Sequence, residues 1–340
     1  MPLSSVISRD FSLRLHNTFG IESHADSYLP VRSAADLQAM LDDPQLSRLP
    51  QLMLGGGSNI VLTGDFHGLV LHSCSSGIEI VDADDNTTLV RAAAGVGWQA
   101  LVEWTLQHGL GGLENLSLIP GSVGAAPIQN IGAYGVEMSA CFHSLTAFDL
   151  TDGTLFTLDR AACEFGYRDS VFKRALRGRA MILDVTFALP RRWTPNLRYA
   201  ELAAELAHLP APSMQQVSAA VSAIRRRKLP DPAVIGNAGS FFKNPLVSRA
   251  LRDDLLASYP GLVSHDQPDG SSKLAAGWLI EQCGWKGKTL GAAGVYEKQA
   301  LVLVNRGGAR GADVMALAQK IESHVRQRFG VTLEAEPVIV

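Results

Sequence analysis

Two glycine-rich segments contain the residue types that binding of a phosphorylated ligand requires. The first is Gly55-Gly56-Gly57-Ser58-Asn59, which directly follows the apolar run Gln51 to Leu54. Three consecutive glycines let the backbone approach a phosphate closely and expose several N–H donors, while Ser58 and Asn59 add side-chain donors. An ordinary turn between two strands has a similar composition, so this motif alone leaves both interpretations open.

The second segment runs from Ile119 to Gly135 and reads IPGSVGAAPIQNIGAYG. Its small residues allow close contact with a large planar ligand, and its backbone amides could bind a diphosphate. Generic loop glycines explain the composition of this segment but not its length and glycine density. We therefore expect its backbone to be shaped around a ligand.

Two side chains outside these segments could act on a bound ligand. Arg168, in Tyr167-Arg168-Asp169, could grip a planar carboxylate through two parallel hydrogen bonds, or could simply pair with a surface carboxylate. Ser240 follows Gly239 and could be catalytic, although capping a turn is the commoner role of such a serine. No GxSxG motif surrounds Ser240, so the residues do not indicate a hydrolase nucleophile.

A third glycine motif, Gly95-Val96-Gly97-Trp98-Gln99-Ala100, fits the dinucleotide fingerprint GxGxxA. The surrounding sequence is rich in strand patterns, without an evident βαβ unit or an acidic residue about twenty positions later. We therefore expect these glycines to serve a tight strand-to-helix turn and the packing of Trp98.

The elements that must position these residues mix helical and strand patterns, which indicates an α+β protein. Asp152-Gly153 lies between two alternating segments and predicts a β-hairpin. Helices are predicted over residues 34–46, 97–108, 217–228, 249–258, 274–283 and 312–329. Strands are predicted over residues 51–54, 59–62, 69–72, 87–94, 181–189, 300–305 and 332–340.

Composition narrows the class of protein further. The chain has 340 residues, 46% of them hydrophobic and 19% charged, which is typical of a globular protein with two or three domains. Its net charge of -3 lacks the basic footprint of a nucleic-acid binder. No export signal or membrane-spanning run is evident. The four cysteines are widely separated, so we expect free thiols, no zinc site and a cytoplasmic location.

Six motifs in order resemble the UDP-N-acetylenolpyruvoylglucosamine reductase family: GGGSN, IPGSVGAAPIQNIGAYG, FGYRDSVFK, KLPDP, GNAGSFFKNP and LEAE. The resemblance extends from Asn17 to Glu336. It implies an α+β FAD-binding fold of the vanillyl-alcohol-oxidase type, with two α+β subdomains, followed by an α+β substrate-binding domain. The corresponding divisions are residues 1–70 with 330–340, residues 71–212, and residues 213–329.

The resemblance also implies which residues hold FAD. No His or Cys occurs in either glycine-rich segment, so we expect the flavin to be bound non-covalently. The implied contacts are Gly55, Gly56, Gly57, Ser58, Asn59, Ile119, Pro120, Gly121, Ser122, Gly124, Ala125, Gln129, Asn130, Gly132, Tyr134, Ile182 and Arg225.

The same resemblance assigns the catalytic roles to Ser240, Arg168 and Glu336. Glu336 is followed by Pro337 and Val338, where the family usually has Val-Arg, so Glu334 is kept as a second candidate. Tyr199 resembles the tyrosine that covers the UDP moiety in the family's tyrosine-loop subgroup. The implied substrate contacts are Tyr199, Lys228, Asn244, Lys286 and Gln299.

The activity implied is the NADPH-dependent reduction of an enolpyruvyl UDP sugar through FAD, by a monomer that contains no metal. Arg168 and Glu336 would stabilise the enolate that forms, and Ser240 would protonate its carbon. Three alternatives stay open: an FAD-dependent oxidase of the same fold, an inactive sugar-nucleotide or flavin-binding protein, and a nicotinamide-only dehydrogenase that uses GxGxxA.

Overall fold

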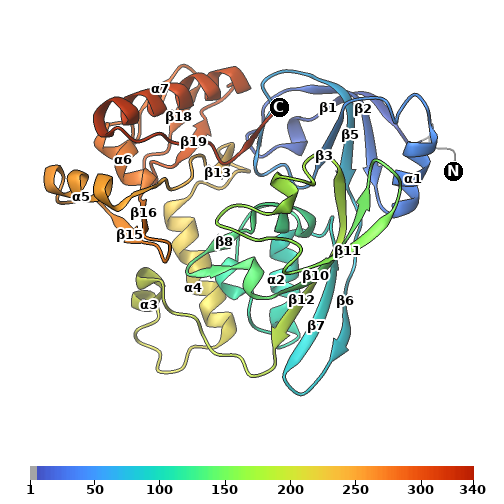
Figure 1. Cartoon of the computed structure of the whole chain (residues 1–340), viewed down its shortest axis with the longest axis horizontal. Coiled ribbons are helices and arrows are strands. Elements are labelled where there is room, and N and C mark those ends of the chain that lie inside the picture. The colour runs from blue at the N-terminus through green and yellow to red at the C-terminus, as the bar shows by residue number, and fades with distance from the viewer. Residues whose placement is uncertain (1–5) are drawn as a thin grey trace. The chain divides into compact units, whose positions relative to one another are not determined.

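The computed structural model describes residues 6–340, which form two compact units (Figure 1). The first unit comprises residues 6–11, 25–57 and 67–227, and the second comprises residues 12–24, 58–66 and 228–340. Each unit is therefore assembled from separate stretches of chain. The three-part division expected from the sequence stays a prediction.

The described first unit contains two sheets of four or five strands. The larger is antiparallel, in the order β11-β10-β12-β7-β6, and the smaller has the order β1-β2-β5-β3. The strands of the larger sheet are β6 (Ile78–Ala83), β7 (Thr87–Ala93), β10 (Phe142–Asp149), β11 (Leu155–Asp159) and β12 (Ala180–Pro190). Those of the smaller sheet are β1 (Ser8–Ser12), β2 (His24–Val31), β3 (Gln51–Leu54) and β5 (Phe66–Ser73).

Short elements and four helices complete the first unit. The helices are α1 (Ala34–Asp42), α2 (Trp98–Gln107), α3 (Ala200–Glu205) and α4 (Met214–Lys228), whose last residue belongs to the second unit. The two-residue strands β8 (Gly132–Ala133) and β9 (Val136–Glu137) pair with each other. The short 3-10 helices are η3 (Glu114–Leu116), η4 (Val123–Ala125), η5 (Pro127–Gln129), η6 (Met138–Ala140) and η7 (Val171–Lys173).

The turn at GxGxxA confirms that this motif is not a dinucleotide fingerprint. The strand before it, β7, pairs antiparallel with both β6 and β12, so no parallel βαβ unit exists here. Gly97 precedes the first residue of α2, and Trp98 is 1% exposed in the core of the large sheet. Its indole nitrogen donates a hydrogen bond to the Leu116 carbonyl at 2.9 Å. The motif therefore serves packing, as expected.

The predicted hairpin at Asp152-Gly153 is also confirmed, because β10 and β11 pair antiparallel on either side of it. Gly153 has φ +77°, a conformation that side chains other than glycine rarely adopt. Asp152 accepts hydrogen bonds from the backbone and hydroxyl of Thr154, at 2.9 and 2.6 Å.

The described second unit consists of small sheets, three α-helices and one short 3-10 helix. One sheet has the order β13-β19-β18-β17, a second has the order β14-β16-β15, and β4 pairs parallel with β20. The strands are β4 (Ile60–Val61), β13 (Asn237–Ser240), β14 (Leu246–Ser248), β15 (Ser264–Asp266), β16 (Ser271–Leu274), β17 (Thr289–Leu290), β18 (Ala293–Val295), β19 (Val302–Asn305) and β20 (Val338–Ile339). The helices are η2 (Arg14–His16), α5 (Arg249–Ser258), α6 (Ala276–Gln282) and α7 (Gly311–Phe329).

Helix α7 has clear end signals in the sequence. The Asp313 carboxylate accepts a hydrogen bond from the Arg310 backbone at its start, and Gly330 ends the helix with φ +67°. Arg326 and Arg328 lie in the last turn, where basic side chains interact favourably with the helix dipole. Within residues 6–340, no helix has the length and hydropathy needed to cross a membrane.

The C-terminal segment departs most from expectation. A strand was expected over residues 332–340, but only Val338–Ile339 forms one, and Ala335 makes an isolated bridge to Phe242. Pro337 separates these two short pairings and has no N–H with which to continue a ladder. The first predicted helix is also shorter, since α1 ends at Asp42 rather than at residue 46.

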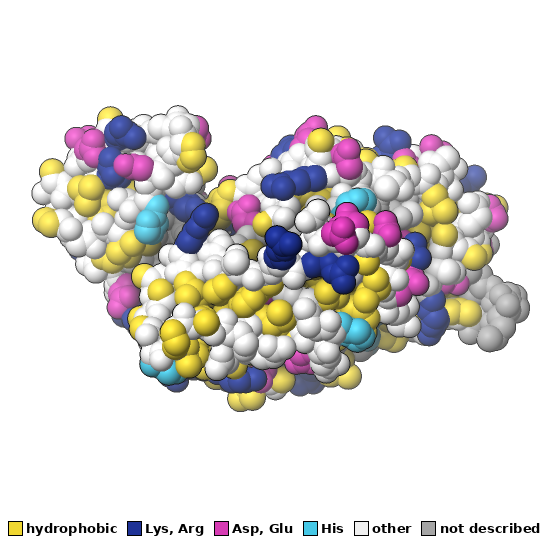
Figure 2. Space-filling model, turned by 90° about the horizontal axis from the view of Figure 1, so that it is seen from below, with side chains coloured by type: hydrophobic (Ala, Val, Ile, Leu, Met, Phe, Trp, Pro, Cys, Tyr) yellow, Lys and Arg dark blue, Asp and Glu magenta, His cyan; other side chains and the backbone are white. Residues whose placement is uncertain are grey.

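The two units present charges of both signs at their surface. Figure 2 shows Lys and Arg side chains interspersed with Asp and Glu on the face in view. Ion pairs between such side chains include Arg91 with Glu79 and Arg227 with Glu205. Interspersed charge favours solubility and gives little long-range attraction for a polyanion.

Asp149, at the end of β10, should make the first unit sensitive to acid. Hydrogen bonds from Arg179 and Thr151 lower the pKa of its buried carboxyl from 3.8 to about 2. Since the folded state binds this proton less tightly than the unfolded state, the stabilisation is complete above about pH 5 and is lost as the pH falls toward 2. We expect Asp149→Asn to lower the free energy of unfolding at pH 7 by about 1 kcal/mol, and by less at pH 3.

Urea unfolding of the wild type and the variant at pH 7 and pH 3 measures this difference. Asp85→Asn serves as a control, because Asp85 is an exposed carboxylate of the same unit. The acid sensitivity would not come from Asp149 if the free energy of unfolding of Asp149→Asn fell as much between pH 7 and pH 3 as that of the wild type.

Candidate functional site

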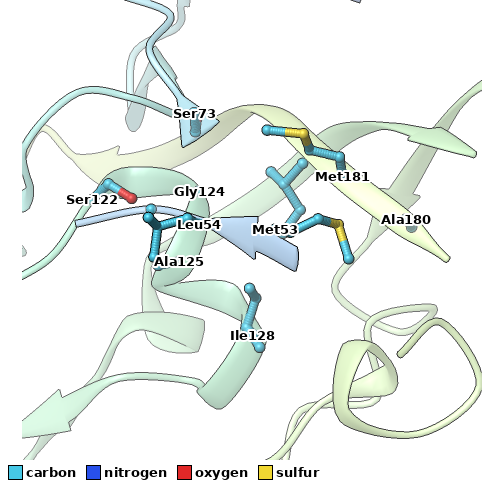
Figure 3. Close-up of a pocket in the computed structure, with 11 residues that line it drawn as sticks. Met53, Leu54, Ser73, Ser122, Gly124, Ala125, Ile128, Ala180 and Met181 are labelled. Carbon is cyan, nitrogen blue, oxygen red and sulfur yellow. The ribbon is translucent and has the colours of Figure 1, made fainter. Parts of the chain in front are cut away.

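A pocket in the first unit brings together the two glycine-rich segments predicted to bind FAD. Figure 3 shows Ser122, Gly124 and Ala125 beside the strand that carries Met53 and Leu54. Five predicted cofactor residues line this pocket: Gly55, Ser122, Gly124, Ala125 and Ile182. The other lining residues are Met53, Leu54, Ser73, Ile128, Ala180 and Met181.

The two segments approach so closely that glycine is required at the contact. A Cβ atom added to Gly55 would lie 2.5 Å from the Ser122 hydroxyl oxygen. One added to Gly56 would lie 2.9 Å from the Cα atom of Gly121, which is backbone and cannot rotate away. The first segment therefore packs directly against the second through bare backbone.

Ser122 supplies an unused polar group at this contact. The residue is 6% exposed, and its hydroxyl has no hydrogen-bond partner within residues 6–340. A buried hydroxyl without a partner costs free energy, so such groups in native structures usually bind a ligand or water. Together with the apolar lining, this hydroxyl fits a large, mostly planar cofactor with a few polar atoms.

Several other residues of the second segment have structural contacts. Asn130 is 1% exposed with φ +45°, and its amide nitrogen donates to Glu137 and to the Gly166 carbonyl. Its side-chain oxygen accepts from the Ser139 backbone at 3.1 Å. Ile119 and Gln129 are half-buried, and Pro120 is exposed. Their predicted contacts with FAD stay predictions.

Tyr134 lies at the centre of a polar and aromatic cluster. Its ring centroid is 5.0 Å from that of Tyr199, with the planes at 76°. Arg225, on α4, hydrogen-bonds to Tyr134, and desolvation lowers the pKa of the Arg225 guanidinium. Burial is also the main reason that the pKa of Tyr134 is raised. The structure thus brings three of the predicted residues together in one unit.

Arg168 contacts the second glycine-rich segment. Its Nη2 atom donates a hydrogen bond to the Gly132 carbonyl at 2.8 Å, and its backbone has φ +55°, which is unusual for a non-glycine residue. The neighbouring Asp169 pairs with Arg174 instead.

Ser240 and Glu336 lie on adjacent backbone segments of the second unit. Ser240 ends β13, opposite Val302 of β19. The next residue, Phe241, accepts a hydrogen bond from the Glu336 backbone at 2.8 Å. The Ser240 hydroxyl makes no hydrogen bond to another residue of the described chain, so it does not cap a turn.

The two candidate glutamates differ in their surroundings. Glu334 has a side chain that is 72% exposed and forms an ion pair with Lys243. Glu336 is half-buried, and its backbone carbonyl accepts a hydrogen bond from the Asn59 amide at 3.3 Å. Asn59 belongs to the first glycine-rich motif, so this motif contacts the C-terminal segment within the second unit.

The predicted substrate residues occupy different parts of the chain. Tyr199 is 40% exposed and directly precedes α3, and Lys228 is the last residue of α4. The Asn244 side chain accepts from the Ala276 backbone at the start of α6, at 3.0 Å. Lys286 pairs with Glu281 at 2.9 Å, and the Gln299 side chain accepts from the Leu301 backbone at 3.3 Å.

Sequence reasoning missed two polar residues that are buried beside Tyr134. Glu114 is 3% exposed and Asn115 is fully buried, and both bond to residues about eighty positions later. Their position in the sequence could have indicated that they are buried, because these two adjacent polar residues lie inside the mostly apolar and glycine-rich run LGGLENLSLIPG.

Family models match both halves of the chain. An FAD binding domain model matches residues 25–159, and a model of the UDP-N-acetylenolpyruvoylglucosamine reductase C-terminal domain matches residues 231–340. The expected order of an FAD-binding region followed by a C-terminal domain, in a mixed α and β fold, is confirmed.

Individual relatives match over nearly the full length. The UDP-N-acetylenolpyruvoylglucosamine reductase of Burkholderia cenocepacia (strain HI2424) is 57% identical over 333 residues, which cover 97% of this chain and 95% of the relative. That of Paraburkholderia phymatum is 56% identical over 341 residues, covering 99% of each. A crystal structure of the reductase from Thermus caldophilus matches the fold with a TM-score of 0.67 at 24% identity, covering 98% of each chain.

Proposed function

The chain belongs to the UDP-N-acetylenolpyruvoylglucosamine reductase family, and on that premise we propose that it reduces UDP-N-acetylglucosamine enolpyruvate to UDP-N-acetylmuramate. The electrons come from NADPH through FAD, and the product is a peptidoglycan precursor. The observation that carries this proposal is identity above 50%, over nearly the whole length, with the reductases of Burkholderia cenocepacia and Paraburkholderia phymatum.

The pocket of the first unit supports FAD as the cofactor. Gly55, Gly56 and Gly124 let the backbone segments around the pocket pack closely together, and Ser122 would donate its unused hydroxyl hydrogen to the cofactor. When bound, FAD would supply the hydride-transfer chemistry that connects NADPH to the enol ether. The lining residues include no His or Cys, so we propose that the flavin is held without a covalent bond.

Three side chains would stabilise the negative charge that forms on the substrate and supply the proton that neutralises it. Hydride addition to the terminal vinyl carbon leaves negative charge that spreads into the substrate carboxylate. We assign Arg168 to this charge, because a guanidinium can bind a carboxylate through two hydrogen bonds. Ser240 would then donate its hydroxyl proton to the adjacent carbon. A serine is a weak acid, so this step needs the strongly basic centre that hydride addition creates.

We assign the remaining role, stabilisation of the enolate together with Arg168, to Glu336 rather than Glu334. Glu336 is half-buried next to the Phe241 backbone, one residue after Ser240, whereas Glu334 is exposed and neutralised by Lys243. A carboxyl that stabilises an enolate must donate a proton or hold a water, and a solvated ion pair suits neither task. Pro337 after Glu336 does not change this assignment, because proline lacks only its own backbone N–H and the role assigned to Glu336 uses the Glu336 side chain.

The remaining substrate contacts are proposed from the resemblance. Tyr199 would cover the UDP moiety, which would place the chain in the tyrosine-loop subgroup, and its 40% exposure leaves the ring able to stack on a ligand. The further proposed contacts are Lys228, Asn244, Lys286 and Gln299. We also propose a cytoplasmic location, which the four free thiols support, and a monomer, which is proposed from the resemblance alone.

Flavin absorbance in the anaerobic purified protein tests the proposed function. Bleaching by NADPH, followed by recovery when the enolpyruvyl UDP sugar is added, is the expected result. Bleaching that recovers only with oxygen would indicate an oxidase, and binding of the sugar nucleotide without recovery would indicate an inactive binding protein. A colourless protein that cannot be reconstituted with FAD would contradict the proposal.

A further inference from the structure

Residues 193–199, which end at Tyr199, have no regular secondary structure but are held at several points within the first unit. We call this stretch the tyrosine segment. A loop without backbone pairing normally samples many conformations, and ordering it on binding reduces affinity. The contacts of the tyrosine segment therefore decide how Tyr199 is presented.

Glu114 holds the first residue of the tyrosine segment. Its Oε1 atom accepts a hydrogen bond from the Trp193 indole nitrogen at 2.8 Å, and its Oε2 atom accepts from the Gly112 backbone at 2.5 Å. The Trp193 ring lies against Gly111, where an added Cβ would be 2.2 Å from the ring. Glu114 is 3% exposed and forms no ion pair within residues 6–340, so these two donors satisfy a buried carboxylate.

Asn115 joins the middle of the tyrosine segment to the second glycine-rich segment. Its amide nitrogen donates to the Asn196 carbonyl and to the Tyr134 carbonyl, both at 2.9 Å. Its side-chain oxygen is buried and has no hydrogen-bond partner among the described residues. The NH₂ group thus donates one hydrogen bond to each of two carbonyls, whereas the side-chain oxygen accepts none. One fully buried side chain therefore links the two segments.

Further contacts extend this link to Tyr199. The Asn196 side chain donates to the Gly135 carbonyl at 3.4 Å, and the Tyr134 and Tyr199 rings meet edge to face. Tyr199 is 40% exposed, so one part of the ring is braced and the rest is open. The position of the ring is set by residues 111–116 and 134–135.

We propose that Glu114 and Asn115 are positioning residues that hold the tyrosine segment and thereby set the affinity for the sugar nucleotide. The proposal rests on the proposed function, in which Tyr199 contacts the UDP moiety. Because these contacts hold the segment in one arrangement, less of it has to be ordered when the sugar nucleotide binds, and the Michaelis constant for the sugar nucleotide is kept low.

Steady-state kinetics with a double-mutant cycle tests the proposal. Asn115→Ala should raise KM for the enolpyruvyl UDP sugar about 5- to 30-fold, while the rate of flavin bleaching by NADPH stays unchanged. Tyr199→Ala should raise KM as well, and the double variant should be no worse than Tyr199→Ala alone. Additive losses, or an unchanged KM in Asn115→Ala, would overturn the proposal.

A second variant covers the case in which Asn115→Ala fails to fold. Trp193→Phe keeps an aromatic ring against Gly111 but removes the N–H that Glu114 accepts. It should likewise raise KM for the sugar nucleotide without affecting flavin bleaching. A Trp193→Phe enzyme with the wild-type KM would count against a positioning role for Glu114.

Hydrogen exchange separates this inference from the proposed function. Backbone amides of residues 193–199 should exchange faster in either variant than in the wild type, whatever the protein catalyses. Faster exchange in a protein that never turns over the sugar nucleotide would refute the proposed function and leave the holding contacts established. Unchanged exchange would refute the holding contacts even if the enzyme is active.

Discussion

Ser240→Ala should leave the reduction of FAD by NADPH intact and slow formation of the lactyl ether product by about 10²- to 10⁴-fold, the usual contribution of a positioned acid. The substitution removes one hydroxyl that makes no hydrogen bond to the described chain, so no structural partner is left unsatisfied. The loss should therefore appear in the second half-reaction alone. Stopped-flow absorbance, with NADPH first and the enolpyruvyl UDP sugar second, measures both steps separately.

A matched serine supplies the control for this experiment. Ser258 is an exposed residue at the end of α5 in the same unit, and Ser258→Ala should leave both half-reactions at the wild-type rate. If Ser240→Ala slowed flavin reduction as much as product formation, the hydroxyl would be acting on cofactor or fold, and its assignment as proton donor would be wrong.

Elements with strong local signals are predictable from this sequence. Helix α5 has the predicted bounds Arg249–Ser258. Ser248 caps its first turn, because the Ser248 hydroxyl oxygen accepts a hydrogen bond from the Leu251 backbone N–H at 3.2 Å. The hairpin between β10 and β11 follows from Asp152-Gly153 in the same way. The two glycine-rich segments were also expected to serve one ligand, and the structure places them in contact at Gly56 and Gly121.

Features that depend on distant partners could not be derived from local pattern. Residues 332–336 alternate like a strand, but the neighbouring backbone at 241–243 offers only a short pairing before Pro337. Glu114 and Asn115 have no periodic signal, because their partners Trp193 and Asn196 lie far along the chain. Polar residues in an apolar run are informative only once the groups they bond to are known.

Gly56→Val should abolish retention of FAD during purification and weaken its binding by at least about 100-fold. A Cβ at this position would already lie 2.9 Å from the Gly121 Cα atom and 3.2 Å from its carbonyl carbon, and valine adds two methyl groups. Because both contacts are backbone, relief requires the two glycine-rich segments to separate. That separation would displace the Ser122 hydroxyl from the pocket it shares with Gly55.

The change in cofactor affinity can be distinguished from unfolding by measuring FAD titration and the FAD-dependent rise in melting temperature on the same samples. Gly64→Val is the matched control, since Gly64 is exposed and an added Cβ there meets nothing within 4 Å. The control should bind FAD like the wild type. If Gly56→Val did so too, the contact between the two segments would not be part of the cofactor site, and the pocket beside Met53 and Met181 would need another ligand. If the variant instead folds without FAD, the backbone contact at Gly56 is what shapes the site, and the requirement for glycine in this motif is steric rather than a property of the turn.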